Sequence, residues 1–176
     1  MNITEKIIIT DTNIITDLSN AGILEKFIEL DNVFVSDLVM NDEFNSNTCN
    51  EHILKKMKTI EFTAIQMIEL EKLQKTTNKL SQYDLINYIT ARDCRGILAT
   101  GDKRLKDYSE KNGVLVIRTL KIIEMLASDS IITYKEAMNA CALLKICKDT
   151  RIPIESIDDF MNKLMYKYLL IENILQ

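Results

Sequence analysis

Short apolar runs rich in β-branched residues alternate with segments whose apolar positions recur every three or four residues. The runs predict buried strands and the periodic segments predict helices. Strands are expected at residues 7–10, 33–35, 60–63, 97–100 and 114–117. Helices are expected at residues 13–18, 23–28, 38–43, 67–75, 81–91, 105–111 and 120–126, with a polar loop at 45–50. This alternation favours a parallel sheet covered by helices on both faces.

The pattern changes after residue 126. Tyr134–Cys147 and Ile154–Leu170 both show helical spacing without another strand, and Pro153 stands where it can begin the last helix. We therefore expect one α/β domain over residues 1–126 and a helical extension over residues 127–176. The extension must bury its apolar face on the domain, on a second copy or on a partner, and we favour the domain. Its candidate contact residues are Ala137, Leu143, Leu144, Ile157, Phe160 and Leu164.

Composition and charge narrow the class of protein. The chain has 176 residues, 22 basic and 26 acidic, so its net charge of −4 lacks the basic footprint of a strong nonspecific nucleic-acid binder. A metal-dependent nuclease remains compatible with this charge, because bound cations reverse the sign that a phosphate meets. No leader or membrane-spanning stretch is apparent, and we expect a cytoplasmic protein. Four cysteines without a C-x-x-C pair and the single His52 favour reduced structural thiols over a zinc site.

Acidic residues stand beside the predicted strand ends. Asp11 follows the first strand and Asp102 follows the fourth. The carboxyl ends of parallel strands share one edge of the sheet, so these acids can converge there. Asp84 and the pair Asp42/Glu43 lie in the first turns of predicted helices. Two unit negative charges 4 Å apart repel by about 4 kcal/mol at an effective dielectric near 20, so converging carboxylates need a cation such as Mg²⁺ or Mn²⁺.

Each of these acids also has a local explanation. Asp11 can cap the first helix, and Asp42 can be a surface acid. Ser81-x-x-Asp84 is close to a capping box, and Asp102 can belong to a simple turn. Local capping does not explain why two apolar strands both end in acids, so the set as a whole favours a shared site.

Four motifs in order carry a resemblance to a known family. They are Ile-Ile-Ile-Thr-Asp11-Thr-Asn13, then Val-Phe-Val-Ser36 with Asp42 six positions later, then Leu-Ser81-x-x-Asp84, then Ile-Leu-Ala-Thr100-Gly-Asp102. Together they resemble the PIN-domain ribonucleases, and within that superfamily they are similar to the VapC-like toxins. The resemblance covers roughly residues 6–126. A match in four parts is more specific than any single motif.

The resemblance implies a PIN-like three-layer α/β/α fold, with a central, mainly parallel sheet of about five strands and a C-terminal helical extension. It implies an endoribonuclease that depends on Mg²⁺ or Mn²⁺, with one ion or two. The implied catalytic and metal-binding acids are Asp11, Asp42, Asp84 and Asp102. Glu43 is an alternative second acid, because the family usually has Glu there. Asn13, Ser36 and Thr100 match polar positions that orient these acids or the substrate.

The implied partners are an RNA substrate, a possible protein antitoxin and a second copy in a homodimer, with no membrane. Several basic residues can contact phosphates or serve only for solubility: Arg92, Arg95, Lys103, Arg104 and Lys106, with less weight on Arg118 and Lys121. Tyr83 and Tyr88 flank Asp84 and can stack on a base, although packing is the simpler explanation.

Two rival functions compete with a nuclease. The first is a haloacid-dehalogenase-like phosphatase, which also begins with a strand ending in Asp. That class needs a second Asp two residues later, where this chain has Asn13. The second rival is a noncatalytic PIN-fold protein that binds RNA or acts as a scaffold. It is disfavoured because every acidic position can be filled.

Overall fold

The computed structural model describes residues 3, 5–43 and 55–175, and their side chains apart from those of Glu43 and residues 170–175. The described strands are β1 (Ile8–Thr10), β2 (Val33–Ser36), β3 (Lys58–Ile60), β4 (Ile97–Ala99) and β5 (Leu115–Ile117). The described helices are α1 (Thr12–Asn20), α2 (Leu24–Ile28), α3 (Asp37–Glu43), α5 (Ala64–Thr76), α6 (Gln82–Asp93), α7 (Lys103–Lys111), α8 (Thr119–Ser128), α9 (Tyr134–Ile146) and α10 (Ile154–Leu175). The loop predicted at residues 45–50 lies outside the described residues.

The strands form one sheet in the order β3-β2-β1-β4-β5, and every neighbouring pair is parallel. The chain builds β2 and β3 on one side of β1 and then places β4 and β5 on the other. Open α/β sheets bind ligands at the carboxyl edge where the strand order reverses in this way. Because Thr10 pairs with Ala99, the residues that follow them, Asp11 and Thr100, are neighbours at this edge.

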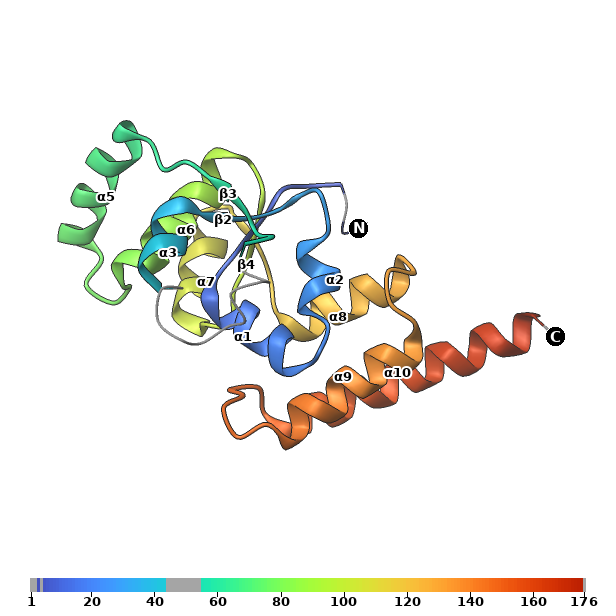
Figure 1. Cartoon of the computed structure of the whole chain (residues 1–176). Helices are drawn as coiled ribbons and strands as arrows, with labels where there is room; N and C mark the ends of the chain where they lie inside the picture. Colours follow the sequence, from blue (N-terminus) through green and yellow to red (C-terminus); the bar gives the residue numbers. More distant parts are fainter. Residues whose placement is uncertain (1–2, 4, 44–54, 176) are drawn as a thin grey trace.

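Helices cover both faces of the sheet (Figure 1). On one face α6 packs against β1, β2 and β4, with α3 and α7 beside it. On the other face lie α1, α2 and α8. Every residue of β1 and β4 is buried, which explains why these strands appear as continuous apolar runs in the sequence. The predicted three-layer α/β/α fold is therefore confirmed.

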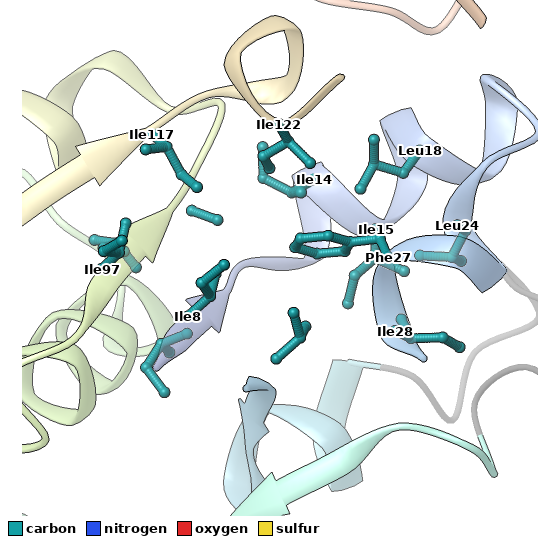
Figure 2. Close-up of a cluster of buried hydrophobic side chains, with 14 of the residues drawn as sticks. Ile8, Ile14, Ile15, Leu18, Leu24, Phe27, Ile28, Ile97, Ile117 and Ile122 are labelled. Atoms are coloured by element: carbon teal, nitrogen blue, oxygen red, sulfur yellow. The ribbon is translucent and has the colours of Figure 1, made fainter. Parts of the chain in front are cut away.

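The core between the sheet and α1, α2 and α8 is built from branched aliphatic side chains around one aromatic ring. Figure 2 shows Phe27 of α2 among these side chains, with Ile8 and Ile97 contributed by adjacent strands. Ile14 from α1 and Ile122 from α8 complete the contact between the layers, and all five residues are fully buried. This packing fixes the start of α1, and with it the position of Asp11.

The C-terminal helices form an antiparallel hairpin outside α1 and α8 (Figure 1). α9 packs on α1 and α8, and α10 packs on α9 and α8. Most of the predicted contact residues are buried or packed on the core, whereas Leu143 is 43% exposed. In the part of the chain that the structure describes, no helix is both long and apolar enough to cross a membrane.

The predicted third strand is shifted. We expected a strand over residues 60–63, but β3 ends at Ile60. The backbone N–H of Phe62 donates to Asp37 Oδ1 at 2.9 Å instead of extending the sheet. Thr63 then begins α5, because its side chain and that of Gln66 form a reciprocal capping box. The alternating apolar residues at 60 and 62 therefore reflect a strand end followed by a helix cap.

The described cysteines, Cys94, Cys141 and Cys147, are free thiols. Burial raises the pKa of the Cys141 thiol to about 12, so it is protonated and packs as an apolar side chain within α9. Cys49 and His52 lie outside the described residues.

Candidate active site

Asp11 stands where β1 ends and α1 begins, and the residue is only 5% exposed. It occupies the N-cap position of α1, yet its side chain makes no capping hydrogen bond. Its Oδ2 instead accepts hydrogen bonds from the Thr100 hydroxyl at 2.7 Å and from the Asn13 amide at 3.2 Å. Helix capping therefore does not explain this carboxylate, which is held at the sheet edge toward β4.

Thr100 links the two acids that follow the strands. Its hydroxyl donates to Asp11 and accepts a hydrogen bond from the backbone N–H of Asp102 at 3.1 Å. Asp102 is the N-cap of α7, where its Oδ1 accepts from the backbone N–H groups of Arg104 at 2.7 Å and Leu105 at 2.9 Å. Both capping bonds use the same oxygen, so the helix cap does not occupy Oδ2. One buried hydroxyl thus connects the Asp11 carboxylate to the backbone of Asp102, and these two residues follow the neighbouring strands β1 and β4.

The other predicted acids lie on the helices beside this edge. Asp84 closes the capping box of α6: its Oδ2 accepts from the Ser81 N–H at 2.7 Å, and its own N–H donates to Ser81 Oγ at 3.1 Å. Asp42 is exposed on α3, and its Oδ2 accepts a hydrogen bond from the Tyr83 hydroxyl at 3.4 Å. The side chain of Glu43 lies outside the described part of the chain. The choice between Asp42 and Glu43 as the second acid therefore stays open.

Asn87 is the α6 residue that reaches Asp11. Its amide nitrogen lies 3.5 Å from Asp11 Oδ1, and the residue is fully buried. It stands nearly one helical turn after Asp84, between the apolar residues Ile86 and Tyr88. The four sequence motifs do not include it. The sequence did contain one indication of its role, a polar residue inside an apolar helix segment. Buried polar groups need hydrogen-bond partners, so such a residue is expected to contact another polar group.

Two further buried oxygens belong to residues at this edge of the sheet. Asn87 Oδ1 and Ser36 Oγ have no hydrogen-bond partner among the described residues. Ser36 ends β2, and continuing the register of Ile9 with Phe34 by two residues places Ser36 level with Asp11. Carboxylate and neutral oxygens are the ligands that suit Mg²⁺ or Mn²⁺. The donor chemistry at this edge therefore fits a divalent ion of that kind.

The described acidic side chains do not form a compact cluster. Within residues 3, 5–43 and 55–175, no three acidic, histidine or cysteine side chains are grouped closely enough to hold a metal ion together. Mg²⁺ keeps several waters and is usually held by one or two carboxylates plus substrate phosphates, so a magnesium site does not require three grouped side chains. Metal binding by Asp11, Asp42, Glu43, Asp84 and Asp102 stays a prediction.

Some of the predicted phosphate-binding and base-stacking residues have structural partners. Arg92 pairs with Glu69 and Asp93, and its guanidinium lies 5.6 Å from the centroid of the Tyr88 ring. Tyr88 is buried and packs edge-on against Tyr108. These contacts give Arg92 and Tyr88 packing roles. Lys106 pairs with Glu110 along α7, whereas Lys103 and Arg104 are exposed beside Asp102.

Comparison with protein families identifies the class. Residues 7–165 match a family model described as DUF3368, a PIN domain, and PIN domains are generally nucleases. The match covers most of the chain, so the protein belongs to this PIN-domain family. It begins just before β1 and extends past residue 126 through α9 into α10. No curated protein and no solved structure matches the chain. The family assignment removes the haloacid-dehalogenase-like alternative, while similarity to the VapC-like toxins stays a prediction.

Proposed function

We propose that this PIN-domain protein is a divalent-metal-dependent endoribonuclease that hydrolyses RNA phosphodiester bonds. The observation that carries the proposal is the buried Asp11 carboxylate, joined through Thr100 to Asp102 at the switch point between β1 and β4. The Thr100 hydroxyl and the Asn13 amide donate to Asp11 and orient its carboxylate at the sheet edge. A divalent cation would supply a counter-charge to both acids.

In this proposal, the residues at the sheet edge either bind the metal or orient its ligands. Asp11 and Asp102 would hold Mg²⁺ or Mn²⁺, which when bound supplies a Lewis acid and a more acidic water for hydrolysis. Thr100 and Asn13 donate to Asp11 and so fix the direction of its carboxylate. Asn87 contributes its amide from the α6 side. Such outer partners of metal ligands generally set the orientation of the ligand.

The direct test is cleavage of single-stranded RNA by the purified protein. We expect cleavage with added Mg²⁺ or Mn²⁺, loss of cleavage on chelation with EDTA, and recovery when the ion is returned. Metal binding should also raise the melting temperature, because an ion that binds only the folded state stabilises it. Absence of both cleavage and thermal stabilisation would overturn the proposal.

We further propose that the nuclease is the toxin of a toxin-antitoxin pair, with a protein antitoxin as partner. The support for this role is the resemblance of the four motifs to VapC-like toxins. Induced expression should then arrest bacterial growth, whereas expression of Asp11→Asn to the same level should not. Equal growth of the two cultures would contradict the toxin role and leave RNA hydrolysis untouched.

The capping bonds of Asp84 favour one rival function, a noncatalytic RNA-binding protein. A carboxylate that caps its own helix has a structural role that does not require a metal. Two matched variants separate the roles. Ser81→Ala keeps the Asp84 charge and should cost about 1 kcal/mol of stability while activity is retained. Asp84→Asn keeps an acceptor for the Ser81 N–H, so it should retain most of the stability and lose cleavage at least tenfold.

Cleavage rates and unfolding midpoints of both variants provide the measurement. If Asp84→Asn cleaves as fast as the wild type, the carboxylate acts only as a cap. If Ser81→Ala loses cleavage to the same extent as Asp84→Asn, the cap geometry rather than the charge controls activity.

A further inference from the structure

A groove of about 600 Å³ runs from the sheet edge to the connection between α9 and α10. Its walls come from the start of α1, from residues 101–103, from residues 118–120 and from residues 149–153 together with Ser156. These segments are distant in sequence and meet because the C-terminal hairpin packs outside α1 and α8 (Figure 1). The volume lies within the range of about 300–1,000 Å³ that is typical of ligand pockets.

One end of the groove is the candidate metal site. Asp102 and Asn13 line the groove, and Asn13 donates to Asp11 Oδ2 at 3.2 Å. A ligand with one phosphate at Asp11 and Asp102 can therefore continue into the groove without leaving the surface. The far end is formed by the α9–α10 connection, which brings Arg151 into the wall.

Two guanidinium groups line the groove, Arg151 at the far end and Arg118 closer to Asp102. Arg118 and Arg151 are exposed, line the groove and form no ion pair with a carboxylate in the described part of the chain. Arg118 Nη2 donates to the Gly101 carbonyl at 3.0 Å, which directs this side chain across the groove toward the β4–α7 turn. A planar guanidinium binds a phosphate with two parallel hydrogen bonds, so both groups suit a phosphodiester backbone.

The groove also contains acidic residues, so its two guanidiniums offer local phosphate contacts rather than a positively charged surface. Asp17 accepts a hydrogen bond from the Thr119 hydroxyl at 2.6 Å. Burial raises the pKa of Asp17, while the hydrogen bond, Arg118 and Arg151 act in the opposite direction. The groove is lined by three acids, Asp17, Asp102 and Asp149, and by three basic residues, Lys103, Arg118 and Arg151, so its formal charges balance before a metal binds.

The remaining wall suits a single strand. Leu120, Ile152 and Pro153 supply apolar surface for a ribose or a base between the phosphate contacts. A pocket of this volume accommodates a group of drug size, which corresponds to a nucleotide rather than to a double helix. Unpaired nucleotides also expose the faces that protein side chains recognise in RNA.

We propose that this groove binds the single-stranded RNA next to the scissile bond, with Arg118 and Arg151 contacting its backbone phosphates. The proposal rests on the proposed ribonuclease function and adds the path of the substrate. It assigns the α9–α10 hairpin a role in substrate binding, since Arg151 belongs to the connection between those helices.

The test measures binding separately from cleavage. Asp11→Asn protein is titrated with a fluorescently labelled single-stranded oligoribonucleotide, and anisotropy gives Kd at several salt concentrations. Adding Arg118→Ala or Arg151→Ala should weaken binding about tenfold, as expected when a hydrogen bond to a charged group is removed. Each change should also reduce the slope of log K against log salt by about 0.7 for each phosphate that is no longer neutralised.

Lys148→Ala is the matched control. Lys148 is exposed on the same α9–α10 connection and carries the same charge, but it does not line the groove. Its removal should leave Kd within twofold and the salt slope unchanged. Melting curves identify any variant that is not folded, and the exposed Arg151 is the safer position in this respect.

The possible results separate the proposed RNA path along the groove from the proposed ribonuclease function. If wild type cleaves RNA and both arginine variants bind like their parent, the groove is not the RNA path, although the nuclease function stands. If Lys148→Ala weakens binding as much as Arg151→Ala, the effect is general electrostatic attraction and the assignment to the groove is wrong. If wild type neither binds nor cleaves RNA, the proposed function fails and this inference fails with it.

Discussion

Asp11→Asn is expected to abolish RNA cleavage, with a loss greater than about 100-fold, while the fold is retained. Outer-sphere partners of a metal are worth about 10–100-fold in affinity or activity, and a direct ligand should be worth more. The substitution removes the buried charge and also places an amide among groups that donate to Asp11, namely Thr100 and Asn13. Both effects disfavour a cation at this position.

Metal-dependent stabilisation gives a readout that does not depend on activity. At a Mg²⁺ concentration 100 times its Kd, wild type should gain about 2.7 kcal/mol of stability, whereas Asp11→Asn should gain little. Asp129→Asn is the matched control, because Asp129 also accepts a hydrogen bond, from the Ile3 N–H at 2.8 Å, but lies at the other end of α8 from the groove. Equal Mg²⁺ stabilisation of wild type and Asp11→Asn would contradict the role of Asp11 as a ligand.

The neighbouring positions of Asp11 and Thr100 were predictable in principle. Strands buried on both faces produce continuous apolar runs, and β1 and β4 are of this kind. Parallel strands end at a common edge, so the polar residues after each run were expected to meet. The sequence could not supply the strand order. Only the adjacency of β1 and β4 makes the 2.7 Å contact between Thr100 and Asp11 possible.

The direction of the Asp84 side chain was not predictable from its position. The same sequence, Ser81-x-x-Asp84, satisfies both a capping box and the third acid of a PIN domain. The first use turns the carboxylate back to its own N-cap, and the second turns it toward the sheet edge. Rotamer energies and local hydrogen bonds decide between them, and the structure contains the capping bonds. The Asp84→Asn and Ser81→Ala pair tests whether the carboxylate also serves the site.

Contacts between distant segments account for the other features of the structure that the sequence did not predict. Phe62 continues an alternating apolar pattern, but its backbone N–H donates to Asp37, which lies 25 positions earlier. This hydrogen bond replaces a sheet hydrogen bond, so the strand does not continue to Phe62. Arg118 is the N-cap of α8 and Arg151 belongs to the α9–α10 connection, and packing of the C-terminal hairpin brings both to one groove. Neither arrangement leaves a local signal, because each depends on how already-formed elements pack against one another.

Asp102→Asn is expected to reduce cleavage at least tenfold while stability changes by less than about 1 kcal/mol. Asp102 has two roles that this substitution separates: it caps α7 through Oδ1, and it is proposed to bind the metal. Asparagine is as good an N-cap as aspartate, so the helix start should be preserved. The lost charge at the helix N-terminus costs only about 0.3–1 kcal/mol. Cleavage rate and urea midpoint, measured on the same preparation, give the two quantities.

Asp102→Ala provides the comparison, because alanine removes both the charge and the cap. It should lose cleavage to the same extent as Asp102→Asn but cost about a further 0.5–2 kcal/mol of stability, the usual range for removal of an N-cap. Activity would then follow the carboxylate, whereas stability would follow the capping oxygen. If Asp102→Asn retained full cleavage and only Asp102→Ala lost it, Asp102 would act through the position of α7. Asp11 would then be the one strand-end carboxylate left to hold the ion.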